Sequence, residues 1–274
     1  MNNGIFGFPG YSASDLVIHP ETTLWMSRVT SLGASYTDLS TRVADSLLTA
    51  LKNNGVFTKI VALYPFLGVG INAARVPLID KLVAGVANNT GFVTGDFTET
   101  TGLANPTEAV KYFDTGMKAS QLEGANNVGG IGWWENNIGF GSGTEPVGAY
   151  NNAASTRFCM DLRSTLSAFR WGNPSNGAQS SVSAVNGHYY GQRSSSISRE
   201  IYLNGNQIAT NTTSDSGTGS SERNMWIMGN NASSPTYWKG RCACCYFTLG
   251  NLSAGEVAAL HTILDTYLIT PTGR

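Results

Sequence analysis

Aromatic side chains are the feature of this sequence whose type and spacing could carry recognition chemistry. Trp133 and Trp134 are adjacent, as are Tyr189 and Tyr190. Sugars stack on exposed aromatic rings. Neighbouring residues of a strand point to opposite faces, so one ring of each pair faces a core and the other faces solvent, a subunit contact or a glycan. Burial in a core is the alternative for each ring. The candidate ligand-binding residues are Trp133, Trp134, Trp171, Trp238 and Tyr189, and the other aromatics that could lie exposed are Tyr190, Trp226 and Tyr237.

Acidic residues that could perform hydrolysis are scattered. A retaining glycosidase needs two carboxyl groups about 5 Å apart, whereas Glu135, Glu145, Asp161 and Glu200 stand singly. The sequence also lacks the Gly-x-Ser-x-Gly, His-Glu-x-x-His, Gly-x-Gly-x-x-Gly and phosphate-loop motifs. We therefore expect that the chain is not an enzyme and does not hydrolyse common polysaccharides. Turnover that disappears on replacing Glu135 or Asp161 would contradict this expectation.

Histidines and cysteines show no metal-ligand spacing. His19, His188 and His261 each stand apart from an acid or thiol partner, which favours structural roles. The sequence therefore predicts neither a metal nor a cofactor.

Three of the four cysteines crowd into one predicted strand. Cys242 and Cys244 share a face there, while Cys245 points to the opposite face, so the three thiols do not converge on one ion. Buried free thiols are the favoured interpretation. A disulfide from distant Cys159 to one of the three is the alternative, provided that their strands are neighbours.

The composition favours a β-rich globular protein that contacts other proteins. Of the 274 residues, 41% are hydrophobic and 13% charged, and the 32 glycines fit many turns between short strands. A net charge of −1 gives no electrostatic basis for binding nucleic acid or an anionic membrane. We expect no membrane insertion, because no apolar stretch reaches transmembrane length. We also expect no signal peptide, because residues 1–10 lack a basic segment and an apolar run.

Short, regularly spaced apolar segments predict an antiparallel β-sandwich. The expected strands are residues 110–116, 129–135, 147–150, 156–162, 166–171 and 182–190, followed by a hairpin over 199–208. The Asn204-Gly205 pair is a strong hairpin signal, because both positions of such a turn take positive φ. A last helix is predicted where Ser253 and Glu256 have capping-box spacing and an apolar stripe extends to Leu268.

The order of these segments resembles the concanavalin A-like, laminin-G-like jelly rolls of bacteriophage virion proteins. The resemblance rests on the Asn-Gly hairpin, on residues 225–231 and on residues 252–256 before the last helix. Upstream, residues 25–29, the helix to Lys52 and segments 55–60, 63–66 and 73–78 look like the helical lead-in of phage tail, fibre and head-decoration proteins. The resemblance implies a mainly β fold, a concanavalin A-like antiparallel β-sandwich (jelly roll) preceded by a small helical N-terminal region.

Three regions follow from this interpretation. Residues 1–20 form an arm whose Phe6, Phe8 and Tyr11 either dock on a neighbour or on a larger particle, or pack on their own subunit. Residues 21–90 form a small helical anchoring or oligomerisation region, and residues 91–274 form the jelly roll. A helix from Thr37 or Asp38 to the Asn-Asn-Gly stop at 53–55 carries one apolar stripe. This stripe packs on its own small domain or, alternatively, forms a seam between subunits.

The expected function is that of a structural virion protein, a head-decoration, fibre or tail component made in the host cytoplasm. Its expected partners are its own copies in a symmetric homo-oligomer, with a trimer favoured, and capsid or tail proteins. In a host-attachment role it also contacts a host-surface glycan. The alternative is a carbohydrate-binding adhesin or lectin-like module, and a glycoside hydrolase ranks third. Deletion of residues 1–20 is expected to weaken attachment more than folding.

Overall fold

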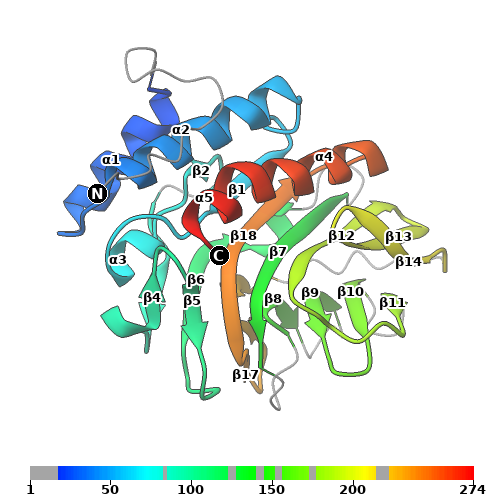
Figure 1. Ribbon diagram of the computed structural model, residues 1–274. Helices are drawn as coiled ribbons and strands as arrows, with labels where there is room; N and C mark the ends of the chain where they lie inside the picture. Colours follow the sequence, from blue (N-terminus) through cyan, green and yellow to red (C-terminus); the bar gives the residue numbers. More distant parts are fainter. Residues whose placement is uncertain are drawn as a thin grey trace.

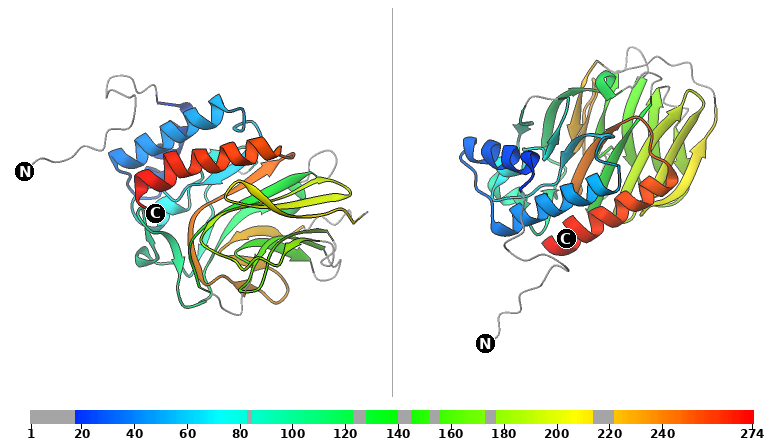
Figure 2. Two further views of the ribbon diagram at one scale, coloured as in Figure 1. Left: turned by 45° about the vertical axis from the view of Figure 1, so that its right-hand side comes forward. Right: turned by 90° about the horizontal axis from the view of Figure 1, so that it is seen from above.

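The computed structural model describes residues 18–82, 85–122, 128–139, 145–151, 156–172, 177–213 and 222–274. Two β-sheets pack face to face, and helices cover the outer face of one of them (Figures 1 and 2). The predicted mainly β sandwich with a small helical region before it is therefore confirmed. The predicted anchoring residues Phe6, Phe8 and Tyr11 lie outside the described residues.

The first sheet has the strand order β14-β13-β12-β7-β18-β1-β2, with β5 and β4 attached to β18. Its strands pair antiparallel throughout the described residues. The strands are β1 (Ile60–Tyr64), β2 (Ile79–Asp80), β4 (Phe97–Thr98), β5 (Gly102–Asn105), β7 (Gly129–Ile138), β12 (Gly187–Ser195), β13 (Ser198–Leu203), β14 (Asn206–Asn211) and β18 (Gly240–Leu249). Strands β1 and β2, from the region predicted to be a helical lead-in, therefore extend this sheet.

The second sheet has the order β11-β10-β9-β8-β15-β6-β3, and β16 and β17 join it beside β8. Its strands are β3 (Asn88–Thr90), β6 (Tyr112–Lys118), β8 (Val147–Asn151), β9 (Thr156–Leu162), β10 (Ser167–Gly172), β11 (Ala178–Ser180), β15 (Asn224–Ile227), β16 (Gly229–Asn231) and β17 (Thr236–Tyr237). Only the β16–β8 pair is parallel among the strand pairs of the described residues.

Helices α2 and α4 lie across the outer face of the first sheet (Figures 1 and 2). The helical segments are α1 (Pro20–Ser31), α2 (Asp38–Asn53), α3 (Ile71–Ala74), η1 (Thr94–Asp96), η2 (Ala119–Leu122), α4 (Ala254–Leu264), η4 (Asp265–Ile269) and α5 (Thr270–Thr272). Both predicted starts are confirmed, because Thr37 caps α2 and the Ser253–Glu256 capping box opens α4. In the described part of the chain, no helix is both long and apolar enough to cross a membrane.

Two hydrophobic cores lie on opposite faces of the first sheet. One core fills the space between the sheets, and the other lies between the first sheet and the helices. Trp133 belongs to the former and Trp134 to the latter, so their predicted opposite orientation is confirmed. The apolar stripe of α2 packs in the second core together with Ile60, Leu63 and residues of α4.

The cysteines depart from simple alternation. The pairing of β18 with β7 is irregular between Arg241 and Cys244, which marks a β-bulge. As a result Cys242 and Cys245 face the core between the sheets and Cys244 faces the helices. The prediction that Cys242 and Cys244 share a face was therefore wrong. All four cysteines, including Cys159, are buried free thiols, and burial raises the pKa of Cys244 to about 12.

One buried carboxylate joins three segments of the chain. The Glu135 side chain is inaccessible to solvent. Its Oε2 accepts hydrogen bonds from the indole nitrogens of Trp133 (3.0 Å) and Trp238 (2.8 Å). Its Oε1 accepts from the backbone nitrogens of Asn137 (3.2 Å) and Arg241 (3.0 Å). Burial raises the pKa of Glu135 to about 7, although these four donors lower it. Glu135 is thus a structural anchor between β7 and the β17–β18 segment.

Glu135→Gln is expected to lower the free energy of unfolding at pH 8 by roughly 3 kcal/mol. An amide offers one oxygen, so its NH₂ group would face either the two indole N–H groups or the two backbone N–H groups. Urea denaturation measures the change. The control Glu222→Gln replaces an exposed acid and is expected to stay within about 0.5 kcal/mol of the wild type. Equal stability of the two variants would show that Glu135 is not an anchor.

Candidate functional site

Most of the aromatics predicted to bind a ligand are in the core. Trp133, Trp171, Trp238 and Tyr189 are at most 1% exposed, so they have no ring face available for stacking on a sugar. The prediction was wrong for these residues because side-chain alternation gives the direction of a ring but not what covers it. Trp134 is also buried, at 7% exposure, but its edge lines a cleft.

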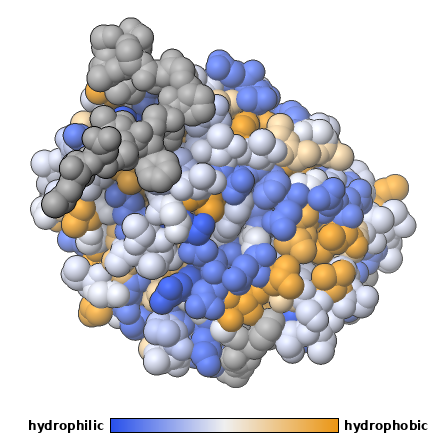
Figure 3. All heavy atoms as spheres, viewed as in Figure 1, coloured by the Kyte–Doolittle hydropathy of each residue, from blue (hydrophilic) through white to orange (hydrophobic). Residues whose placement is uncertain are grey.

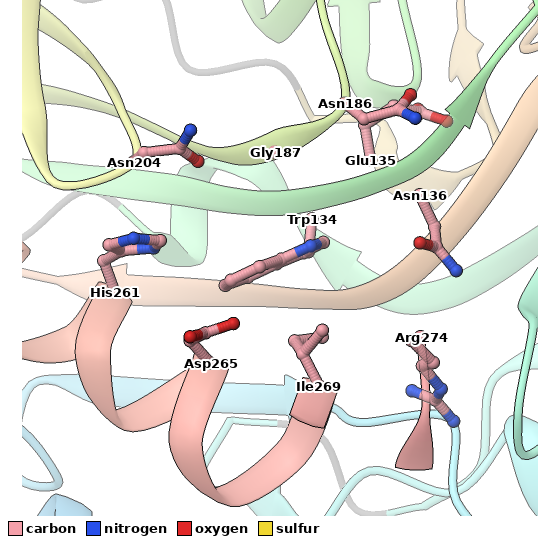
Figure 4. A pocket seen from close by; sticks show the side chains of 10 residues that line it. All are labelled: Trp134, Glu135, Asn136, Asn186, Gly187, Asn204, His261, Asp265, Ile269 and Arg274. Carbon is pink, nitrogen blue, oxygen red and sulfur yellow. The ribbon is translucent and has the colours of Figure 1, made fainter. Parts of the chain in front are cut away.

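The cleft lies in front of β7, where the helical cover of the first sheet ends. It is open and has a volume of about 360 Å³. Strand β7, the segment before β12 and the β13–β14 turn form one wall, and α4, η4 and Arg274 form the other (Figure 4). Hydrophilic residues gather in the middle of this face of the molecule (Figure 3).

Three nearly parallel rings lie next to one another, and two of them, those of Trp134 and His261, line the cleft. The ring centroids of Trp134, His188 and His261 are 5.4 to 5.6 Å apart, with interplanar angles of 9 to 22°. The Nε2 atom of His188 lies 2.8 Å from the hydroxyl of Tyr246. Burial lowers the pKa of His188 to about 3 and also lowers the pKa of His261. Both imidazoles are therefore neutral near pH 7.

Asparagine side chains surround the opening. The Oδ1 atom of Asn204 accepts a hydrogen bond from the His188 nitrogen (2.9 Å), and Oδ1 of Asn186 accepts one from the Ile138 nitrogen (3.0 Å). Anchoring through oxygen leaves both NH₂ groups without a hydrogen-bond partner among the described residues. The amide of Asn136 makes only a long contact to the Thr101 carbonyl (3.4 Å). Asn186 and Asn204 therefore present donors at fixed positions in the cleft.

Asp265 supplies the acceptor opposite these amides. It stands at the first position of the π-helical turn η4, which precedes Pro271. Proline lacks a backbone N–H and clashes with the carbonyl four residues earlier, and a wider turn relieves both problems. The Asp265 carboxylate is exposed and has no hydrogen-bond or ion-pair partner among the described residues.

Arg274 forms the end of the cleft away from His261 (Figure 4). Its Nε donates to the Glu99 carbonyl (2.8 Å), and its Nη1 donates to the carbonyls of Pro65 (2.8 Å) and Ala243 (2.5 Å). Its Nη2 donates to the Phe66 carbonyl. Desolvation lowers the pKa of Arg274 to about 10, so it remains charged near pH 7. Its guanidinium mainly holds loops together.

The hairpin and the last helix, both predicted from the sequence, contribute Asn204, His261 and Asp265 to the cleft. Asn204 and Gly205 both have positive φ, as the Asn-Gly pair predicts. A Cβ at Gly205 would lie 3.0 Å from the Ala258 Cα, so the turn packs directly on α4. This contact brings Asn204 to the same cleft as His261 and Asp265. The Asn-Gly signal located the turn, but no local pattern predicted its contact with the helix.

A second aromatic group lies on the outer face of the second sheet. Tyr112 stacks on Trp226 with centroids 3.6 Å apart, and Tyr237 lies 6.2 Å from Tyr112. All three rings are partly exposed. Trp226 and Tyr237, which the sequence included only among aromatics that could be exposed, are thus more accessible than the favoured candidates.

The scattered carboxylates have separate structural partners. Asp161 is buried and pairs with Arg163 (2.7 Å) and Arg170 (2.9 Å). Glu200 accepts hydrogen bonds from the side chains of Gln192, Ser194, Ser198 and Tyr202. The Glu145 carboxylate accepts one from Thr236 (3.0 Å). Within the described ranges, no group of His, Cys, Asp and Glu is arranged to hold a metal ion.

Solved structures of known proteins include folds similar to that of this chain. The sialidase of Trypanosoma rangeli, solved with 2,3-difluorosialic acid as a covalent intermediate, is similar over 79% of this chain, with 14% identity and a TM-score of 0.51. The chain spans only 38% of that sialidase. No family model matches the sequence, and no curated protein matches it.

Two weaker similarities are to smaller domains. Domain 4 of an extracellular GH43 arabinanase from Geobacillus stearothermophilus, in complex with arabinotriose, has 14% identity over 74% of this chain and 98% of that domain, with a TM-score of 0.45. The CBM40 domain of a Ruminococcus gnavus sialidase has 11% identity over 58% of this chain and 94% of that domain, with a TM-score of 0.42.

The expectation that the chain is not an enzyme is contradicted by the sialidase match, because the shared fold forms part of an enzyme. The expectation rested on the missing carboxylate pair. That criterion does not cover every glycosidase, since sialidases use a tyrosine nucleophile.

The buried imidazole of His188 makes stability depend on pH. Its folded pKa of about 3 lies below its ordinary value of 6.5, so the unfolded chain binds more protons between these values and acid favours unfolding. His188 should cost the wild type roughly 2 to 3 kcal/mol of unfolding free energy by pH 4.5. His188→Phe keeps a ring and removes this titration.

Urea denaturation of both proteins between pH 7.5 and pH 4.5 measures the effect as a difference in slope. The comparison isolates His188, because His261 acts in the same direction in both proteins. Glu135, whose pKa is raised to about 7, stabilises the folded state as the pH falls, and it does so in both proteins. Parallel pH profiles would contradict the assignment of a neutral buried His188.

Proposed function

We propose that this protein is a carbohydrate-binding β-sandwich and that the cleft in front of Trp134 binds the sugar. The observation that carries the proposal is the arrangement of three asparagine amides and the Asp265 carboxylate around one indole edge. Sugar hydroxyls both donate and accept hydrogen bonds. A wall of fixed amide donors facing a carboxylate acceptor suits adjacent hydroxyl groups of one sugar ring.

Hydrogen bonds to the backbone hold two of the cleft asparagines in place, which favours a preorganised site. Asn204 is fixed by its turn and by the His188 backbone, and Asn186 is fixed by the backbone of Ile138. Residues held by backbone hydrogen bonds lose little conformational entropy when a ligand binds. A sugar is also the first ligand class to test because the sialidase that shares the fold was solved with a sialic acid derivative.

The setting of this function is proposed from the sequence resemblance alone. Attachment of a bacteriophage virion to a host-surface glycan would combine the jelly-roll resemblance with a sugar-binding cleft. The virion location, the homo-oligomer and its trimeric state stay predictions.

A glycan array followed by calorimetry on the best ligand tests the cleft. Wild-type protein is expected to bind oligosaccharides, and Asn136→Ala and Trp134→Phe are each expected to weaken binding about five- to tenfold. Each substitution removes a side-chain group that can donate to a sugar hydroxyl, and one such hydrogen bond is worth about 1 kcal/mol. Trp134→Phe retains a buried ring.

Two control variants locate the binding site. Asn251→Ala changes an exposed asparagine outside the cleft and is expected to leave affinity unchanged. Trp226→Ala removes a ring of the second aromatic group. Loss of binding in Trp226→Ala together with normal binding in both cleft variants would contradict the cleft and place the site on the second sheet. No binding to any glycan would contradict the function itself.

A further inference from the structure

We propose, building on the proposed function, that the cleft selects neutral or amine-bearing sugars and rejects sugars that carry a carboxylate. The proposal rests on the two charged side chains that face the cleft from opposite ends. The Asp265 carboxylate is accessible to a ligand, whereas most donors of the Arg274 guanidinium are taken by backbone carbonyls.

Asp265 is the charge that a ligand meets. Its carboxylate is exposed, lies near the middle of the helical wall and has no hydrogen-bond or ion-pair partner among the described residues (Figure 4). It accepts hydrogen bonds from sugar hydroxyls, or pairs with a sugar ammonium group, without giving up an existing bond. A ligand carboxylate at the same place would meet like charge.

Arg274 is the cation of the cleft, but its guanidinium has other partners. Four of its five N–H groups donate to the backbone carbonyls of Pro65, Phe66, Glu99 and Ala243. Recognition of a carboxylate by arginine normally uses two parallel N–H donors, and only one N–H group remains here. Moving the guanidinium toward a ligand would leave buried carbonyls unpaired, at a cost that one ion pair at a cleft opening does not offset.

The remaining polar groups of the cleft add no positive charge. His261 is neutral, since burial lowers its pKa. The carboxylate of Glu135 points away from the cleft, into the core between the two sheets, where it accepts four hydrogen bonds. The amides of Asn136, Asn186 and Asn204 are uncharged and can donate to a hydroxyl oxygen as well as to a carboxylate. Charge therefore decides between otherwise similar ligands.

Sialylated ligands and their own methyl esters, which are nearly equal in size, test the proposal. A glycan array should carry neutral oligosaccharides, their sialylated forms and the methyl esters of those sialylated forms. Esterification removes the charge and keeps the bulk of the sialic acid. Calorimetry is expected to give at least about fivefold weaker binding for each acid than for its own ester.

Variants of Asp265 connect this preference to one side chain. Asp265→Asn is expected to weaken the binding of neutral sugars about fivefold. It is also expected to bring the ratio of the affinity for each ester to the affinity for its acid close to one. Asp265→Lys is expected to reverse the ratio. Glu222→Gln removes the same charge from an exposed acid elsewhere and should leave the ratio unchanged.

The outcomes separate this inference from the proposed function. Equal or tighter binding of the acids by wild-type protein would overturn the selectivity and leave carbohydrate binding intact. A ratio that persists in Asp265→Asn would overturn the role of Asp265. If neither acids, esters nor neutral glycans bind, the proposed function itself fails.

Discussion

The burial of the first sheet on both faces is the constraint on which the rest of the structure depends. Strands β7 and β18 pair along their length, with one core between the sheets and another beneath the helices. Polar side chains on such strands need internal partners, because water reaches neither face. Glu135 meets this requirement with four donors, two of them tryptophan side chains. The core between the sheets buries Trp133, Trp171 and Trp238 and so removes them from any role in binding a ligand.

The position of the cleft follows from where this double burial ends. Helix α4 and the π-helical turn η4 follow one another without a break, and His261 of α4 and Asp265 of η4 both line the cleft. Beside them β7 is partly uncovered, and Asn136 becomes accessible one residue after buried Glu135. The irregular turn also sets the position of Asp265. A local adjustment to one proline is thus coupled to the chemistry of the cleft.

Local patterns in the sequence predicted the elements well and the site poorly. The Thr37 and Ser253 caps, the Asn204-Gly205 turn and most strands follow from short-range physical chemistry, and the structure confirms them. The bulge at Cys242 and the burial of Trp171 depend on partners distant in the sequence. The cleft combines β7, two segments near β12 and β13, and the C-terminal helices. The spacing of residues along the sequence does not predict that these segments meet.

Fold similarity and site chemistry lead to different expectations for this protein. The sialidase match identifies a shared architecture, and function depends on the side chains placed on it. Here the cleft contains a neutral histidine, three amides, an exposed carboxylate and an arginine held by backbone carbonyls. An arginine that is largely satisfied within its own fold is a poor receptor for an anion, even when it lies in a cleft. Under the proposed function, the charge presented to solvent by Asp265, rather than the charge of Arg274, is therefore expected to decide which sugars the cleft accepts.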